Sequence, residues 1–190
     1  MLNLLLLGPQ GSGKGTQAKR ICAAHGIPHI STGDMFRAAI AARTELGQQV
    51  EPILASGALV PDEITIAIIR ERLGEPDAED GFVLDGFPRN LAQAEALDEM
   101  LGSIERDLDA ILFFDLPDGV ATERLLRRAE LEGRPDDTPE VIARRLAIYH
   151  ADTEPIVEHY RATGKLVPLH AGLPVDEVWA EVETALEVMA

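Results

Sequence analysis

The chain has 190 residues, of which 46% are hydrophobic and 26% are charged, and this composition is typical of a protein with a buried core rather than of a disordered chain. Its 33 acidic residues outnumber its 17 basic residues, and the resulting formal net charge of −16 argues against a general nucleic-acid-binding surface. The single cysteine, Cys22, excludes a disulfide framework and a four-thiolate zinc site within one chain.

Short apolar runs alternate with longer stretches of helical periodicity along the chain. Runs of strand length cover residues 2–7, 28–31, 82–85, 110–115 and 166–170. Helical spacing covers residues 14–25, 90–101, 119–131, 139–163 and 175–188. Because the strands are apolar without alternation, they are typical of a parallel sheet that is covered on both faces. The sequence therefore predicts an α/β fold with a doubly wound parallel sheet.

Two segments interrupt this alternation. Residues 32–73 contain about three helical patterns and no convincing strand, and residues 132–139 interrupt a helix with Gly133, Arg134 and Pro135. Excursions of this kind tend to lie over the carboxyl edge of the strands, where ligands bind. We expect both segments to act as mobile flaps.

The apolar start of the chain differs from a targeting segment. Residues 2–7 lack the basic region of a signal peptide and run directly into glycines. No apolar run approaches the ~20 residues that a membrane span needs. These features favour a cytoplasmic location.

The first predicted strand leads into a glycine-rich loop. The loop reads Gly8-Pro9-Gln10-Gly11-Ser12-Gly13-Lys14-Gly15-Thr16 and precedes a helical stretch. Glycines allow consecutive backbone N–H groups to turn toward one anion, and the following helix adds the positive end of its dipole. Lys14 supplies a positive charge that can follow the β- and γ-phosphates of a nucleotide. This order of features predicts a phosphate-binding loop, whereas the dinucleotide fingerprint has another glycine spacing and no place for the lysine.

The residues expected near a metal depart from the strict phosphate-loop motif. Gly15 stands where that motif has a serine or threonine that ligates Mg²⁺, and Thr16 comes one residue later. We therefore expect Mg²⁺ to be held mostly by phosphates and water. Asp85 ends an apolar strand and is expected to orient the water shell of the metal, although residues 113–115 have the same pattern.

Three further blocks give the sequence a family resemblance. Residues 31–37 read STGDMFR, residues 57–63 read GALVPDE, and residues 85–90 read DGFPRN, followed by Gln93. Together with GPQGSGKGTQ, these blocks make the chain resemble the adenylate kinases, which transfer a phosphoryl group from ATP to AMP. The resemblance covers nearly the whole chain and implies one P-loop kinase domain, 1–190, with a five-stranded parallel sheet.

The resemblance also implies two closing segments. It places a helical monophosphate-binding flap at residues 31–60 and a short lid at residues 128–138. Only residues 129–133 separate Arg128 from Arg134, and they include no cysteine, so we expect no structural zinc. Asp136 and Asp137 are interpreted as turn-forming residues that pair with arginines when the lid closes.

Matching positions to the family motifs implies three sets of site residues. The ATP-binding set is Gly11, Ser12, Gly13, Lys14, Gly15, Thr16, Arg128 and Gly172, the last through its backbone. The AMP-binding set is Thr32, Arg37, Ala58, Leu59, Val60, Gly86, Phe87, Pro88, Arg89, Gln93, Arg134 and Arg145. The catalytic set is Lys14, Arg37, Arg89, Arg128, Arg134 and Arg145.

The basic residues suggest how such a site would work. All but three of the 17 basic residues are arginines, a bias that fits bidentate binding of phosphate oxygens. The phosphate of AMP is already an anionic nucleophile near neutral pH, so no general base is required. We expect catalysis by alignment and charge compensation, with flap closure excluding water as a competing acceptor.

Two other functions remain open at this point. Related kinases that take UMP or CMP typically have alanine at the position of Thr32 and asparagine near Gln93, and the amide of Gln93 suits the donor and acceptor of the adenine edge. A regulator that binds ATP without transferring phosphate would not need so many arginines around an acceptor phosphate. We expect the partners to be ATP, AMP and ADP, with no nucleic acid or membrane, and the chain to be monomeric.

Several other residues are interpreted as structural. Arg127 is expected on a solvated helix face and Cys22 in the core. Trp179 is expected to pack against the last helix's neighbours. The five histidines show no metal spacing, and no chemistry is assigned to them.

Overall fold

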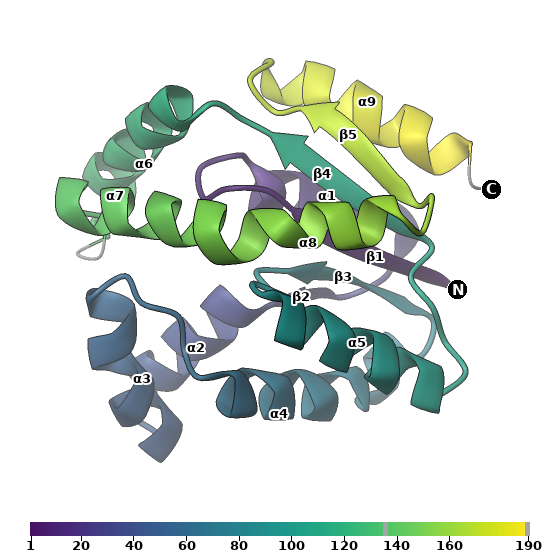
Figure 1. The fold of residues 1–190 in the computed structure, drawn as a ribbon, viewed down its shortest axis with the longest axis horizontal. Coiled ribbons are helices and arrows are strands. Elements are labelled where there is room, and N and C mark those ends of the chain that lie inside the picture. Colours follow the sequence, from purple (N-terminus) through teal and green to yellow (C-terminus); the bar gives the residue numbers. More distant parts are fainter. Residues whose placement is uncertain (135–136, 189–190) are drawn as a thin grey trace.

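The structure is a computed structural model that describes residues 1–134 and 137–188. Within these ranges, one parallel sheet of five strands has the order β2-β3-β1-β4-β5. The strands are β1 (Leu2–Leu7), β2 (His29–Ser31), β3 (Gly81–Asp85), β4 (Ala110–Asp115) and β5 (Leu166–His170). Figure 1 shows the sheet with helices connecting its strands. The prediction of a doubly wound, five-stranded parallel sheet is confirmed.

The helices agree closely with the periodicity of the sequence. In chain order they are α1 (Lys14–His25), α2 (Thr32–Ala41), α3 (Glu45–Ala55), α4 (Asp62–Leu73), the 3-10 helix η1 (Pro76–Ala78), α5 (Leu91–Ser103), α6 (Asp118–Glu132), α7 (Pro139–Ile148), the π-helical turn η2 (Tyr149–Thr153), α8 (Glu154–Arg161) and α9 (Val175–Glu187). The three patterns predicted between residues 32 and 73 are α2, α3 and α4. The long stretch predicted over residues 139–163 is α7, η2 and α8 in direct succession. In the part of the chain described, no helix combines the length and apolarity needed to cross a bilayer.

Side-chain caps fix where several helices begin. Ser31 accepts a hydrogen bond from the backbone N–H of Asp34 at the start of α2, and Asn90 accepts one from Gln93 at the start of α5. Such caps satisfy backbone donors that the first turn of a helix leaves unpaired. Ser31 is the last residue of β2, and Asn90 ends the loop that follows β3, so the polar residues that begin these helices lie near the carboxyl edge of the sheet.

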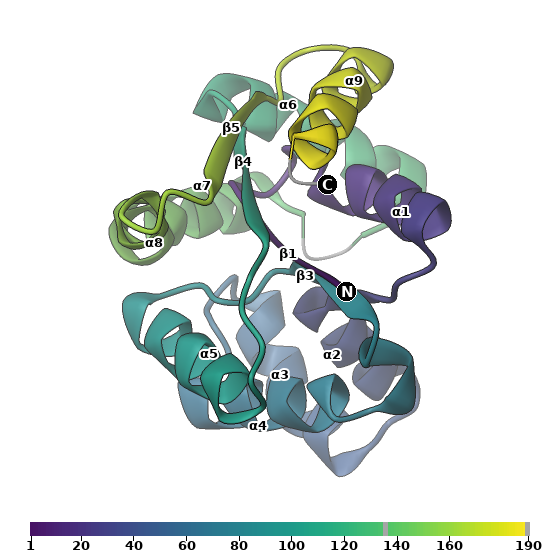
Figure 2. The same ribbon diagram turned by 90° about the vertical axis from the view of Figure 1, so that its right-hand side faces the viewer.

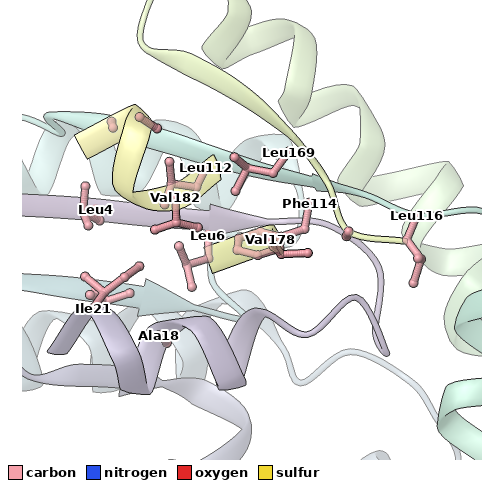
Figure 3. Packing of buried hydrophobic residues seen from close by; sticks show 14 of the residues in the cluster. Leu4, Leu6, Ala18, Ile21, Leu112, Phe114, Leu116, Leu169, Val178 and Val182 are labelled. Atoms are coloured by element: carbon pink, nitrogen blue, oxygen red, sulfur yellow. The ribbon is translucent and has the colours of Figure 1, made fainter. Parts of the chain in front are cut away.

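The sheet separates two hydrophobic cores. On β1, Leu4 and Leu6 face one core, which α1, α6, α7 and α9 complete, while Leu5 and Leu7 face the other core, which α4, α5 and α8 complete. Figure 2 shows α1 and α9 on one side of the sheet and α5 and α8 on the other. Figure 3 shows side chains of α1 and α9 packed with those of β1 and β4. Because β1 is buried on both faces, its uninterrupted run of leucines is explained.

The segment from α2 to the start of α4 has a small core of its own. Phe36, Val50 and Val60 are buried there, and partly buried apolar side chains of α2, α3 and α4 pack around them. This cluster is distinct from the two cores against the sheet, although Ile68 of α4 packs against both this cluster and the core that α5 and α8 cover. In Figure 1, α2 and α3 project from the carboxyl edge of the sheet, and α6 and α7 extend from the same end of the molecule. The predicted flap and lid regions therefore lie at the end where the strands terminate.

The remaining structural predictions have mixed outcomes. Cys22 is only partly buried, although it packs against the core, and burial raises the pKa of its thiol to about 11. Trp179 is partly buried against the same core, and the Arg20 guanidinium lies 5.8 Å from its ring centroid. Arg127 is exposed, as predicted, although it also lies at the border of the cleft described below.

Candidate active site

The carboxyl ends of the strands open into a cleft of about 670 Å³. Its walls come from the loop after β1, from α2, from residues 57–60, from the loop after β3, from α6 and α7, and from the segment between β5 and α9. Most site residues that the sequence predicts line this cleft: Gly11, Ser12, Gly13, Lys14, Gly15, Thr16, Thr32, Arg37, Ala58, Leu59, Val60, Asp85, Gly86, Pro88, Arg89, Gln93, Arg128, Arg134 and Arg145. The fold thus brings together residues that are up to 134 positions apart.

Two predicted residues lie differently. The side chain of Phe87 is 1% exposed and belongs to the core that α5 covers, so a contribution of Phe87 to the site would have to come from its backbone. Gly172 follows β5, and its carbonyl accepts a hydrogen bond from Arg124 at 3.3 Å. Its neighbours Ala171 and Leu173 line the cleft.

The glycine-rich loop leaves room and donors for an anion. Gly11 has a φ of +82°, and a Cβ at this position would lie 2.9 Å from the carbonyl oxygen of Ala121 on α6, so only glycine fits. Gly13 precedes α1 and provides no side-chain cap. The first turn of α1 therefore directs its backbone N–H groups toward the cleft, together with the positive end of its dipole.

Lys14 is folded back over this loop. Its Nζ donates hydrogen bonds to the carbonyl oxygens of Gly8 at 2.7 Å and Pro9 at 2.8 Å. The pKa of the ammonium is lowered to about 8, mainly by burial and also by the charges of Arg89 and Arg128, while the carboxylate of Asp85 works in the opposite direction. A bound phosphate would add a negative charge next to this partly buried ammonium and would stabilise its charged form.

Asp85 ends β3 beside the same loop. Burial raises the pKa of its carboxyl, but the hydrogen bond with His29 and the positive charges of Lys14 and Arg89 outweigh burial and hold the pKa below its ordinary value. His29 Nε2 lies 3.3 Å from Asp85 Oδ2, and the two side chains are only 15% and 14% exposed. The sequence assigned no chemistry to His29, because nothing in its local pattern shows that β2 and β3 are neighbours.

The donor set beside the loop bears on the expected metal. A Cβ at Gly15 would lie 3.8 Å from Asp85 Oδ2, so the carboxylate reaches the start of α1, where no side-chain hydroxyl is present at position 15. Within residues 1–134 and 137–188, no group of three or more His, Cys, Asp or Glu side chains could hold a metal ion by itself. One carboxylate next to a phosphate loop fits a Mg²⁺ ion that keeps most of its ligands from phosphate and water.

The loop after β3 is held by several hydrogen bonds. The carbonyl of Gly86 accepts from Thr32 Oγ1 and from Arg89 Nε, both at 2.8 Å. Gly86 has a φ of +80°, and a Cβ there would lie 2.8 Å from Thr32 Oγ1. Burial lowers the pKa of the Arg89 guanidinium, and the charges of Arg145 and Arg37 add to this effect, yet a guanidinium remains charged at any physiological pH. Arg89 is thus a partly buried cation that lines the cleft.

A buried carboxylate joins two of the predicted lid arginines. Arg128 donates from Nε to Asp137 Oδ2 at 2.8 Å and from Nη2 to Oδ1 at 2.9 Å, and Arg145 donates from Nη1 to Oδ1 at 2.9 Å. The side chain of Asp137 is 0% exposed. Asp137 therefore pairs with arginines as predicted, whereas Asp136 lies outside the described residues. Arg145 Nη2 also donates to the carbonyl of Leu54 on α3 at 3.4 Å.

Where α2 borders the cleft, Arg37 lies near solvent. Its guanidinium pairs with Asp34, and the two side chains are 42% and 61% exposed. An exposed pair of this kind contributes little to stability, so the arginine is available to exchange its partner for a phosphate.

Sequence reasoning missed residues whose role depends on distant contacts. Thr153, in η2, donates from Oγ1 to the carbonyl of Arg89 at 2.6 Å, and Tyr149 lines the cleft from the same turn. Arg124 lines the cleft and donates to the carbonyl of Ala171 at 2.7 Å. The position of Arg124, four residues before Arg128, puts both on one face of α6, and this spacing is a signal that could have identified it.

The sequence matches one protein family along most of its length. The family model described as "Adenylate kinase" matches residues 6–165. A protein named adenylate kinase from Cyanothece sp. is 51% identical over 183 residues, which cover 96% of this chain and 94% of that protein. Proteins of the same name from Parvibaculum lavamentivorans (47% identical over 190 residues, 98% of this chain and 93% of that one) and Archaeoglobus fulgidus (42% over 213 residues, 98% of each) are also similar. The chain belongs to the adenylate kinase family.

Proposed function

We propose that the chain catalyses the reversible transfer of the terminal phosphoryl group of ATP to AMP, which gives two molecules of ADP. The observation that carries this proposal is the convergence of Lys14, Arg89, Arg128 and Arg145 on one cleft from four different parts of the fold. Two anionic nucleotides repel each other, so a site that joins them needs this density of positive charge. Membership of the adenylate kinase family supports the same reaction.

The cleft divides naturally into a donor side and an acceptor side. The loop after β1 and the start of α1 would bind the phosphates of ATP, with Lys14 following the β- and γ-phosphates. The acceptor side would be formed by Thr32, Arg37, residues 58–60 and the loop from Gly86 to Gln93. Arg128, Arg134 and Arg145 would lie where the two phosphate chains meet.

The chemistry then requires alignment more than proton transfer. The acceptor is a phosphate oxygen that already carries negative charge, so no side chain has to remove a proton from it. The loose transition state places charge on the equatorial oxygens of the transferred group, and fixed guanidinium and backbone N–H donors stabilise this charge. Lys14 and the arginines also hold the two nucleotides in line.

Magnesium is proposed as the companion of ATP. Asp85 would hold it through water, since position 15 offers no hydroxyl. When bound, Mg²⁺ would neutralise part of the charge on the nucleotide phosphates. No structural zinc is proposed.

We also propose that residues 31–60 and 128–138 are the parts that close on the nucleotides. The separate core of α2, α3 and α4 supports this idea for the first segment, because a segment with its own core can move as a unit. Closure would exclude water, which otherwise competes with AMP as acceptor. The monomeric state and the cytoplasmic location stay predictions.

An acceptor assay separates this proposal from its alternatives. ADP formation from ATP is measured with AMP, UMP or CMP as acceptor, and we expect turnover with AMP to be the highest by far. Preference for UMP or CMP would identify a pyrimidine monophosphate kinase instead. Absence of turnover with all three acceptors, together with retained ATP binding, would identify a nucleotide-binding regulator.

Arg89→Ala tests whether the positive charges that line the cleft contribute to catalysis. Removing this cation from the lining of the cleft should lower kcat by at least about 100-fold while ATP affinity is largely retained. The matched control is Arg161→Ala, because Arg161 is 59% exposed and pairs only with Glu158 three residues before it among the described contacts. Unchanged turnover in a folded Arg89→Ala variant would remove Arg89 from the site.

A further inference from the structure

The amide of Gln93 is held between two groups of opposite hydrogen-bonding character. Its side chain is 1% exposed and lines the acceptor side of the cleft. Its Oε1 accepts from the backbone N–H of Arg89 at 2.8 Å, and its Nε2 donates to Oδ1 of Asp62 at 2.7 Å. A backbone N–H can only donate and a carboxylate can only accept. Exchanging the oxygen and the nitrogen of this amide would therefore turn both contacts into repulsive ones.

Asn90 reinforces the same arrangement. Its Oδ1 caps α5 by accepting from the backbone N–H of Gln93 at 2.9 Å, and its Nδ2 donates to Oδ1 of Asp62 at 2.8 Å. Because the oxygen of Asn90 is committed to the helix start, its nitrogen must face Asp62. These hydrogen bonds form a network in which only one orientation of each side-chain amide pairs every donor with an acceptor. The network consists of Asp62, Arg89, Asn90 and Gln93.

We propose that Asp62 is a positioning residue that determines the base specificity of the acceptor site by fixing the orientation of the Gln93 amide. The inference rests on the proposed function, because it concerns the monophosphate that accepts the phosphoryl group. Asp62 begins α4, stands outside the set of residues that line the cleft, and acts through Gln93.

The fixed amide presents a defined pattern to a base. After its two protein contacts, Gln93 retains one lone pair on Oε1 and one hydrogen on Nε2. This pair matches a base edge with an amino donor beside a ring-nitrogen acceptor, as N6 and N1 provide in adenine. Hypoxanthine, the base of IMP, has the same size but reverses the pattern, with a carbonyl acceptor at position 6 and an N–H donor at position 1. Only a flipped amide would match it, and Asp62 opposes the flip.

The comparison of AMP with IMP therefore isolates the role of the amide orientation. The two monophosphates have the same ribose, phosphate and ring system, so the rest of the site treats them alike. A ligand that leaves buried polar groups of the protein without matching partners is rejected strongly. A ligand that differs only in the size of an apolar group is rejected much less. We expect the wild-type protein to prefer AMP over IMP by at least about 100-fold in kcat/KM.

Asp62→Asn tests the proposal. An asparagine at this position can donate as well as accept, so it removes one of the two contacts that oppose a flip of the Gln93 amide. The contact with the backbone N–H of Arg89 remains, and the flipped amide becomes less unfavourable rather than free. The ratio of kcat/KM for AMP to that for IMP should fall by about tenfold or more, mainly through the KM of the acceptor, while the KM of ATP stays the same. Glu63→Gln is the matched control, because Glu63 is the next residue, is exposed and loses the same charge in the same turn of α4; its ratio should not change.

The outcomes are distinguishable. A folded Asp62→Asn variant whose AMP-to-IMP ratio stays within twofold of the wild-type value overturns the proposal, and so does a wild-type protein that uses IMP as well as AMP. If Asp62→Asn does not fold, Asp62→Ala carries the same measurement, since it also removes the obligatory acceptor. A wild-type protein that phosphorylates no monophosphate refutes the proposed function rather than the role of Asp62.

Discussion

At the scale of single residues, Lys14 shows what a motif predicts and what it leaves open. The motif predicts a lysine that faces phosphates, and the structure places it in the cleft. The motif does not predict the state of its ammonium, because burial lowers the pKa to about 8 only once the surrounding elements are assembled. The charge of Lys14 is therefore sensitive to pH in a range where most lysines stay fully protonated.

This pKa predicts a pH dependence of ATP binding. Phosphates stabilise the protonated ammonium, so ATP binding to the free protein takes up a proton once the pH exceeds about 8. ATP affinity should hold steady below pH 8 and then fall by up to roughly tenfold per pH unit. Calorimetric titration with ATP between pH 7 and pH 9.5 measures it. Lys14→Met should lack this decline and should lose more turnover than affinity; a flat wild-type profile would contradict the shifted pKa.

At the scale of elements, the sequence pattern predicts the helical stretch formed by α7, η2 and α8 but not the π-helical turn in its middle. Helical periodicity predicts residues 139–163 as one stretch, and that stretch is present. The π-helical turn at Tyr149–Thr153 was not predictable, because the wider turn depends on what the flanking helices pack against and not on local spacing. This turn places Thr153 next to the Arg89 carbonyl, 64 residues away along the chain.

Thr153→Val tests that contact. Valine has nearly the same shape but cannot donate to the Arg89 carbonyl, so the loop that carries Arg89 and Gln93 should lose part of its alignment. We expect kcat/KM for AMP to fall about threefold to tenfold while ATP affinity is unchanged. Thr153→Ser keeps the hydroxyl and should remain close to the wild-type value. Equal kinetics in the valine and serine variants would show that the hydrogen bond has no role in alignment.

The segment between α6 and α7 gives a second prediction at this scale. The carboxylate of Asp137 pairs with Arg128 and Arg145, and bound phosphates would take over part of this charge compensation. Asp137→Asn should therefore lower the free energy of unfolding by about 1–3 kcal/mol without nucleotides and by less with ATP and AMP present. Thermal unfolding with and without nucleotides compares this variant with the exposed control Asp152→Asn. An equal loss in both conditions would contradict a shared role of Asp137 and phosphate.

At the scale of the whole molecule, the sheet was predictable and its order was not. The ranges predicted for residues 2–7, 110–115 and 166–170 coincide with β1, β4 and β5. Local pattern alone did not reveal that β3 separates β1 from β2, or that α2, α3 and α4 share a separate core. Both facts arise from contacts between distant segments.

The same distinction applies to the site. Residues within continuous motifs, such as Lys14 and Arg89, were predictable because each motif is local. Three other residues were not predictable, because each acts through a contact with an element far away in sequence. His29 contacts β3, Asp62 contacts α5, and Thr153 contacts the loop after β3. Periodicity has no access to such contacts.

The central position of the sheet predicts where stability resides. Leu84 on β3 is 0% exposed within the core covered by α4, α5 and α8. Leu84→Ala should lower the free energy of unfolding by about 2–5 kcal/mol, because it removes buried apolar surface and leaves a cavity. Urea unfolding followed by circular dichroism measures this loss. Leu131→Ala is the control, because Leu131 is 75% exposed, and it should change the free energy of unfolding by no more than about 0.5 kcal/mol. Similar losses in both variants would contradict this account of the core.

Arg145 connects both sides of the cleft through one guanidinium, which donates to Asp137 and to the Leu54 carbonyl. In the proposed reaction, two product molecules must depart after every turnover. Separating α3 from α7 requires this guanidinium to give up one hydrogen bond, and releasing the segment that carries Asp137 requires it to give up another. If the two segments open as proposed, Arg145 would couple product departure on the two sides, and we expect the exchange of its hydrogen-bond partners for water to affect turnover.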